Sequence, residues 1–232
     1  MTSIKCIVSA AAVLAALAMA APVAAQTTVV TFDNGWEGWS GPGGTGGATT
    51  IEAAGGNPGM HAHTVFNDFG ITFRTTSNPA FIGDFTQDGT VSAGIDIKVD
   101  AIAFDGVPVS RNLLVDFRSH ALAQGGYPWT SVWHTLTLMQ AGPDWATYAV
   151  TFTPGSQDMP AGWGGYGAED PVTAEPMLPP GVTFADVMAQ VDELAFTTLE
   201  PGYFYGFTDF DVRVDNIRIE RASDAIFADG FD

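Results

Sequence analysis

The chain has 232 residues, 46% of them hydrophobic and only 15% charged, and its 26 acidic residues outnumber 8 basic ones to give a net charge of -18. Clustered Lys and Arg hold the phosphates of nucleic acids and of anionic lipids, so this charge argues against a nucleic-acid or membrane-surface protein. An aromatic content of 12% is too high for a disordered acidic chain. We therefore expect a folded domain with a filled core.

Residues 1–25 have the features of a secretory signal peptide. Lys5 is the only positive charge, an apolar run follows it, and small residues come just before Gln26. Pro22 and the small-residue ending favour cleavage over the alternative of an uncleaved membrane anchor. The single cysteine lies in this segment. We expect an exported bacterial protein, extracellular, at the cell surface or in the periplasm, without cysteine or membrane span after cleavage.

Residues 26–221 are predicted to form one domain made mostly of strands. The clearest strand runs from Thr90 to Asp100, where apolar residues from Val91 to Val99 alternate with polar or small ones. Such short strands, bounded by turn residues, favour an all-β fold of antiparallel sheets packed face to face. In chain order, the predicted strands are 28–32, 48–52, 61–66, 71–75, 90–100, 113–119, 131–139, 145–153, 193–197 and 210–219.

One short helix is predicted near residues 183–190. Thr183 is a good capping residue, and Asp186 stands three positions later, where it can return a hydrogen bond. The residues after the cap place apolar side chains on one helical face. We expect this helix to cover one end of the sandwich through Phe184, Val187, Met188 and Val191.

Three segments carry a resemblance to known families. Phe32 to Trp39 resembles the opening strand of secreted jelly-roll modules, and Asn78 to Phe85 is similar to a Pro-x-x-Phe-x-Gly segment of laminin domain IV, the laminin B module. The closing segment, Val212 to Ile219, resembles that of many carbohydrate-binding jelly rolls. The resemblance implies a jelly-roll β-sandwich used for binding or structure outside the cell, without catalytic apparatus. Thr197 departs from laminin domain IV, which usually has Arg there.

A structural calcium ion is the sharpest metal hypothesis. Calcium takes several oxygen ligands, and the opening strand offers Asp33 while the closing segment offers Asp209, Asp211 and Asp215. In the carbohydrate-binding jelly rolls that the chain resembles, the first and last strands often share a calcium, with an Asp matching Asp215 as a ligand. The alternative is that Asp215 and Asn216 bulge the strand and that the other acids are solvated.

Two other metal patterns are weaker. Asp84 to Gly89 starts like a calcium loop, but Ile95 stands where a bidentate Glu is needed, so a plain turn is favoured. His61 and His63 lie on one strand face, a spacing that can hold zinc or copper. The sequence identifies no third ligand, which favours an ordinary pair of partly buried histidines.

Glycine-rich loops carry a set of aromatic residues. Flat rings held on short loops can stack on the faces of sugars, while neighbouring polar groups bond the hydroxyls. The alternative is that the rings pack the loops onto the sandwich. The candidate ligand-binding residues are Tyr127, Trp129, Trp163, Tyr166, Tyr203 and Tyr205.

The last residues, 222–232, form an acidic and aromatic tail. The segment Ile226 to Asp232 resembles a short terminal sequence found in many exported bacterial proteins. It is either an export or sorting tag or a terminus that packs one Phe onto the domain.

The motif search argues against an enzyme. The sequence has no Gly-x-Ser-x-Gly elbow, no His-Glu-x-x-His helix and no phosphate loop, and the spacing of Glu169, Asp170, Glu175 and Glu200 selects no catalytic pair. We expect a non-enzymatic β-sandwich that binds a polysaccharide, a cell-surface glycan or matrix material. The alternatives are a structural or adhesive surface protein without a small ligand, and a glycosidase on the same scaffold.

Overall fold

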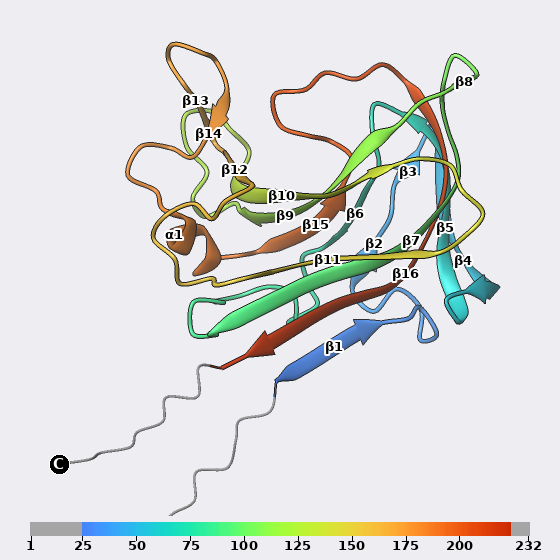
Figure 1. Ribbon diagram of the computed structural model, residues 1–232, viewed down its shortest axis with the longest axis horizontal. Coiled ribbons are helices and arrows are strands. Elements are labelled where there is room, and N and C mark those ends of the chain that lie inside the picture. Colours follow the sequence, from blue (N-terminus) through green and yellow to red (C-terminus); the bar gives the residue numbers. More distant parts are fainter. Residues whose placement is uncertain (1–24, 224–232) are drawn as a thin grey trace, which may run out of the picture.

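The computed structural model describes residues 25–223, and these residues form two curved antiparallel sheets packed face to face (Figure 1). The predicted fold class, an all-β jelly-roll sandwich with one short helix, is confirmed. All ten predicted strands are present. The predicted signal peptide, apart from its last residue, and the tail from residue 224 lie outside the described residues.

The first sheet contains eight strands and the second contains six. The first has the order β11 (Ala146–Phe152), β7 (Thr90–Phe104), β16 (Thr208–Ala222), β5 (Gly59–Asp68), β4 (Gly47–Gly56) and β3 (Gly43–Gly44), with β1 (Gln26–Val30) on β16 and β8 (Val107–Pro108) on β7. The second has the order β12 (Trp163–Tyr166), β10 (Thr130–Met139), β9 (Arg111–Ser119), β15 (Glu193–Thr197), β6 (Thr72–Thr75) and β2 (Trp39–Ser40). A small hairpin joins β13 (Ala168–Glu169) to β14 (Pro176–Met177).

The core lies between the two sheets and is rich in phenylalanine. Phe117 of β9 is fully buried and meets Phe85 and Phe152 edge to face, with ring centroids 5.9 and 5.3 Å apart. Such contacts add to the free energy gained by burying the rings. The period of two puts every second residue of a strand into this core and leaves the others on the outer face.

The helix α1 (Phe184–Met188) covers one end of the sandwich, as the sequence predicts (Figure 1). The Thr183 hydroxyl accepts the backbone N–H of Asp186, and the Asp186 carboxylate accepts the backbone N–H of Thr183. This reciprocal cap stabilises a helix too short to be stable alone. Within residues 25–223, no helix combines the length and the apolar character needed to cross a membrane.

A charged network crosses the outer face of the first sheet. His63 of β5 lies between two carboxylates, with Nδ1 2.6 Å from Glu52 of β4 and Nε2 2.7 Å from Asp211 of β16. Arg213, next on the same face of β16, bonds Glu52 at 2.9 Å and Asp100 of β7 at 2.5 Å. Four adjacent strands are therefore joined by side chains as well as by backbone hydrogen bonds.

The two histidines of β5 differ in their protonation. Burial alone lowers the pKa of His63, but its bonds to Asp211 and Glu52 outweigh burial, and the net effect is a raised pKa. Burial lowers the pKa of His61, which is fully buried and whose Nε2 lies 3.0 Å from the Arg213 guanidinium. His63 therefore keeps its proton to a higher pH than His61 does.

We predict that the contribution of His63 to stability depends on pH. Its folded-state pKa lies above its unfolded value of about 6.5, so the stabilisation is complete below that value and is lost as the pH rises through the folded-state pKa. The variant His63→Gln should therefore lower the free energy of unfolding more at about pH 6 than at about pH 9. Urea unfolding of both proteins across this range measures the difference. A loss of stability that is the same at every pH would contradict the prediction.

Candidate functional site

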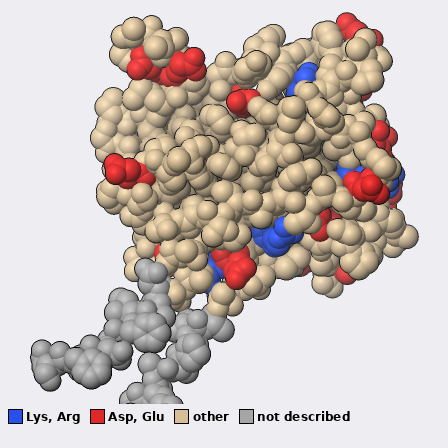
Figure 2. Space-filling model, in the orientation of Figure 1, with Lys and Arg blue, Asp and Glu red and all other residues tan. Residues whose placement is uncertain are grey.

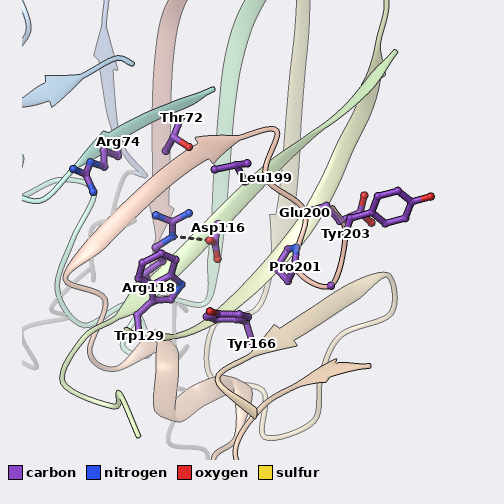
Figure 3. Close-up of a pocket in the computed structure, with 11 residues that line it drawn as sticks. Thr72, Arg74, Asp116, Arg118, Trp129, Tyr166, Leu199, Glu200, Pro201 and Tyr203 are labelled. Atoms are coloured by element: carbon purple, nitrogen blue, oxygen red, sulfur yellow. Dashed lines mark hydrogen bonds and ion pairs between the residues drawn. The ribbon is translucent and has the colours of Figure 1, made fainter. Parts of the chain in front are cut away.

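Three adjoining hollows lie on the outer face of the second sheet and at its edges, and the smallest of them reaches Gly43 and Phe66 of the first sheet. The central hollow has a volume of about 440 Å³ and is lined by strands β6, β9 and β12 and by the loops around Trp129 and Tyr203 (Figure 3). It shares Thr72 and Arg74 with a hollow of about 280 Å³ on one side. On the other side it shares Glu200 and Tyr203 with a hollow of about 400 Å³. We call these three hollows together the groove.

Strand register places the polar residues at the base of the groove. In β9, Leu113, Val115 and Phe117 point into the core, so Asp116 and Arg118 point outward. Arg118 pairs in register with Glu193 of β15 and, through β10, lies in one row with Tyr166 of β12. Asp116 similarly shares a row with Arg74, because both pair with Ala195.

Arg118 holds this base together. Its Nε donates to Asp116 at 2.6 Å and its Nη1 to Glu193 at 2.6 Å, and the three side chains are at least 94% buried. Arg74 lies on the other side of Glu193 at 3.4 Å and is half exposed. Removing one partner of such a buried cluster typically costs about 3–5 kcal/mol, since the remaining charge stays buried without compensation. The cluster therefore fixes the shape of the groove.

One oxygen of this cluster has no partner. Asp116 Oδ2 accepts from Arg118, but Asp116 Oδ1 is buried and has no donor within hydrogen-bonding distance among the described residues. A buried acceptor left without a donor is costly. Asp116 lines the central hollow, so a hydroxyl or N–H group of a ligand there would supply the missing donor if a small side-chain shift exposed this oxygen.

Aromatic rings form the wall of the groove. Trp129 lies over the Arg118 guanidinium, 4.3 Å from Cζ to the ring centroid, and its ring is 5.8 Å from that of Tyr166. Tyr127 meets Tyr166 edge to face at 5.3 Å. Figure 3 shows Trp129 and Tyr166 along one side of the hollow and Leu199 and Tyr203 beyond Asp116 and Arg118.

Four of the six aromatic candidates line this groove, Tyr127 packs against one of them, Tyr166, and Trp163 lies elsewhere. Tyr203 and Tyr205 stack at 5.1 Å and border the hollow of about 400 Å³. Trp163 of β12 packs instead against the core, with its ring 4.8 Å from Phe152 and 5.2 Å from Phe184. It precedes Tyr166 by three residues on the same strand, so the two side chains point to opposite faces of the sheet.

The hydroxyls in the groove stay protonated at neutral pH. Burial raises the pKa of Tyr166; Arg118 opposes this rise, while Asp116 and Glu169 add to it. Burial likewise raises the pKa of Tyr205 to about 12, and the nearby Glu200 carboxylate adds to the effect. Both hydroxyls are therefore available as hydrogen-bond donors or acceptors for a neutral ligand.

The four aspartates predicted to bind calcium lie at three separate places. Asp215 is fully buried, and burial raises its pKa, as do the charges of Asp96 and Asp33, although the N–H groups of Asn57 and Asn216 lower it. Asp33 and Asp215 flank the same turn, since Met60 N–H donates to Asp33 at 3.2 Å and Asn57 N–H donates to Asp215 at 2.6 Å. Asp211 is bound to His63, and Asp209 accepts from Asn67 at 2.6 Å. Asp211 and Asp215 are four residues apart, or about 13 Å along a strand.

The structure supplies carboxylates next to His63 that the sequence did not identify. Ligand atoms of His63, Asp100 and Asp211 lie within 4.8 Å of one another. However, Arg213 and Lys98 both form ion pairs with Asp100, so two cations already occupy the surroundings in which a metal ion would bind. His61 does not join this group, because its Nε2 faces Arg213. The residues Asp84 to Gly89 form a turn in which Asp84 accepts from Thr86.

Most of the charged residues of the groove were missed in the sequence. Asp116, Arg118 and Glu193 come from two strands that are far apart in the chain, and only the folded sheet places them side by side. The available signal was the pair of charges two residues apart in the strand predicted at 113–119, which marks its outer face. Nothing in the sequence showed that aromatic loops would cover these charges.

Comparisons with known proteins give a likeness of fold. No protein-family model and no curated protein sequence matches the chain. The family 11 carbohydrate-binding module from Clostridium thermocellum, in complex with a beta-1,3-1,4-mixed-linked tetrasaccharide, is 13% identical with a TM-score of 0.45, and the match covers 85% of this chain and 95% of that one. The C-terminal family 22 carbohydrate-binding module of C. thermocellum Xyn10B is 10% identical with a TM-score of 0.43, and the match covers 86% of this chain and 95% of that one.

A third similar structure is larger. It contains the CBM22-1 and GH10 modules of C. thermocellum endo-1,4-beta-D-xylanase 10B in complex with xylohexaose, and it is 11% identical with a TM-score of 0.46. The match covers 84% of this chain but only 28% of that chain. With TM-scores below 0.5, none of these likenesses identifies a ligand for this protein.

We predict that Glu200 sets the high pKa of Tyr205 together with burial. The variant Glu200→Gln removes the negative charge near the hydroxyl and should lower the pKa of Tyr205 from about 12. Tyrosinate absorbance after rapid jumps to alkaline pH, read before unfolding, measures this pKa, and Tyr205→Phe identifies the signal. An unchanged pKa in Glu200→Gln would show that burial alone is responsible.

Proposed function

We propose that the protein is an exported, non-enzymatic β-sandwich that binds a glycan chain in the groove. The observation that carries this proposal is the central hollow, which the aromatic residues Trp129, Tyr166 and Tyr203 line together with Asp116, whose Oδ1 has no partner among the described residues. Glycans combine flat apolar ring faces with hydroxyl groups at their edges. A wall of rings beside a buried hydrogen-bond acceptor is complementary to both features.

The extent of the groove supports a chain of several sugars as the ligand. The three hollows adjoin one another across the sheet, and each is bordered by residues that the next one shares. Trp129 is held over Arg118 and Tyr166 is held by strand β12, so these rings lose little freedom when a ligand binds. A preformed site of this kind suits an extended polysaccharide.

The carboxylates of the groove support binding as the function. Asp116 and Glu193 are both engaged by the Arg118 guanidinium at 2.6 Å. A glycosidase needs one carboxyl group as a proton donor and a second one free to attack or to activate water. Two carboxylates that share one buried arginine provide neither group, so we assign them to hydrogen bonding and to shaping the groove.

We also propose a structural calcium ion bound by Asp33 and Asp215. Several oxygens around the turn between β4 and β5 are of the kind that this ion takes: Asp215 Oδ2 and the carbonyl oxygens of Gly59 and Met60 lie close to the backbone of Gly56. The Asp33 carboxylate lies beside Gly59 in the same turn and accepts the backbone N–H of Met60 at 3.2 Å. Carboxylate and carbonyl oxygens are the ligands that calcium prefers. A cation here would also offset the mutual repulsion of Asp33, Asp96 and Asp215.

A second candidate function is adhesion without a small ligand. Phe69, Phe204 and Phe207 form an exposed cluster at one end of the sandwich, with ring centroids of Phe69 and Phe207 only 4.3 Å apart and Phe204 87% exposed. Exposed apolar clusters often mark contact surfaces. If no glycan is retained by the groove, this cluster becomes the leading candidate for the binding surface.

We predict that removing the aromatic wall weakens glycan binding. The double variant Trp129→Ala with Tyr166→Ala should reduce affinity at least about tenfold, because stacked rings contribute about 1 kcal/mol each beyond their buried area. Affinity electrophoresis of residues 26–232 through a panel of polysaccharides gives the measurement. Tyr148→Ala, which removes a ring from the first sheet, should leave the affinity unchanged. Equal retardation of the double variant and the unaltered protein would remove the aromatic wall from the proposal.

We predict that calcium stabilises the fold through Asp215. At a hundredfold excess over its Kd, a ligand adds about 2.7 kcal/mol to the free energy of unfolding, and each kcal/mol raises Tm by roughly 2–4 °C in a domain of this size. Asp215→Asn should abolish the rise in Tm on adding calcium. Asp209→Asn, at a site bound to Asn67, should preserve it. A Tm that does not differ between calcium and chelator would rule the ion out.

A further inference from the structure

Arg111 is set apart from the other basic residues by its lack of an acidic partner. All Lys and Arg residues except Lys5 lie in the described part of the chain, and every one of them but Arg111 has a carboxylate oxygen within 4.0 Å. This is unexpected in a protein with 26 acidic residues. The other described Lys and Arg side chains are each paired with a carboxylate, whereas the positive charge of Arg111 has no carboxylate within 4.0 Å.

The guanidinium of Arg111 is also buried. The residue is only 9% exposed, its Nη1 donates to the Ser110 carbonyl at 2.9 Å, and its Nη2 donates to the Thr208 hydroxyl at 2.6 Å. Nε has no partner among the described residues, and the ring of Tyr205 lies 4.6 Å from Cζ. All these partners are neutral. Burying a charge without a counter-charge is costly, so a group that supplies the negative charge would be bound favourably.

Arg111 lines one of the three hollows of the groove. It lines the hollow of about 400 Å³ next to Leu138, Tyr203 and Tyr205, and this hollow continues into the central one. Figure 2 shows that one face of the domain is largely uncharged, and that acidic side chains outnumber basic ones on it. An uncompensated cation in a hollow of such a protein is a strong local attraction for an anion.

We propose that the Arg111 hollow binds the anionic group, a carboxylate or a sulfate ester, of a sugar in the glycan that occupies the groove. This inference rests on the proposed function and adds the chemical class of the ligand to it. The guanidinium gives charge-assisted hydrogen bonds to the anion, and Tyr205 holds its plane in place. Asn112 donates to Glu200 at 2.8 Å, and both residues line the same hollow as Arg111. Glu200 keeps the anion on the Arg111 side and limits the hollow to one negative group.

Matched pairs of polysaccharides test this inference. Affinity electrophoresis compares a polygalacturonate in which only scattered carboxylates are left unesterified with the fully methyl-esterified polymer, and a lightly sulfated galactan with its desulfated form, so that the two members of each pair share one backbone and differ in the anionic group. The protein should bind the charged member of at least one pair more tightly, and the pair that responds distinguishes a carboxylate from a sulfate ester. Arg111→Gln should reduce that binding about tenfold to a hundredfold and weaken binding to the neutral member much less.

Two further variants separate charge from structure. Arg111→Lys keeps the positive charge and should retain most of the preference, whereas Glu200→Gln removes the opposing charge and should strengthen binding to the charged member about threefold. Arg221→Gln alters an arginine away from the groove, paired with Asp88, and should not change the preference. Thermal melts of each variant establish that it is folded. If Arg111→Gln does not fold, the effect of Glu200→Gln on binding to the charged member still tests the inference.

Each other outcome overturns the inference in a recognisable way. Equal binding of the charged and neutral members removes the anionic subsite while leaving the proposed function in place. A loss of both affinities in Arg111→Gln shows that the arginine only positions the loop and β16. If no polysaccharide retards the unaltered protein, the proposed function fails and the inference fails with it.

Discussion

Strand β16 is the element on which the rest of the sandwich depends, because its backbone is hydrogen-bonded along both edges. One edge pairs with β7, and the other pairs first with β5 and then with β1. Its outward side chains repeat this linkage through Asp211 to His63, Arg213 to Asp100 and Arg218 to Asp96. Breaking β16 out of the sheet would cost all of these interactions together, so the first sheet is a rigid support for the second.

The geometry of the groove depends on how the second sheet packs against the first. The core phenylalanines fix the inner face of β9, and the alternation of the strand then determines where Asp116 and Arg118 stand on the outer face. Arg118 in turn holds Trp129 in place through its contact with the ring at 4.3 Å. Core packing therefore positions the ion pairs, and the ion pairs position the aromatic wall. A substitution of the buried Arg118 would change the position of Trp129 at the surface that meets a ligand.

The sequence predicted the elements well and the site only in part. Alternation identified ten strands, since each needs one buried face, but it missed the four-residue β12 and the two-residue strands such as β2 and β13, which are too short to show a period. Trp163 and Tyr166 stand in one glycine-rich segment, and only their strand register separates a core ring from a groove ring. Asp209 and Asp211 looked like partners of Asp215 because they are close in sequence, yet an extended strand carries them away from it.

The net charge of the protein bears on the kind of anionic glycan that fits the proposed subsite. At physiological ionic strength the Debye length is about 8 Å, so the repulsion from distant acidic residues is largely screened, whereas contact with a buried guanidinium is not. Groups near the groove are still felt, and Glu200 lies in the same hollow as Arg111. A polymer with a negative charge on every sugar would place further anions against Glu200, Asp116 and Glu193. A chain with widely spaced anionic sugars avoids that repulsion and keeps the one favourable contact with Arg111.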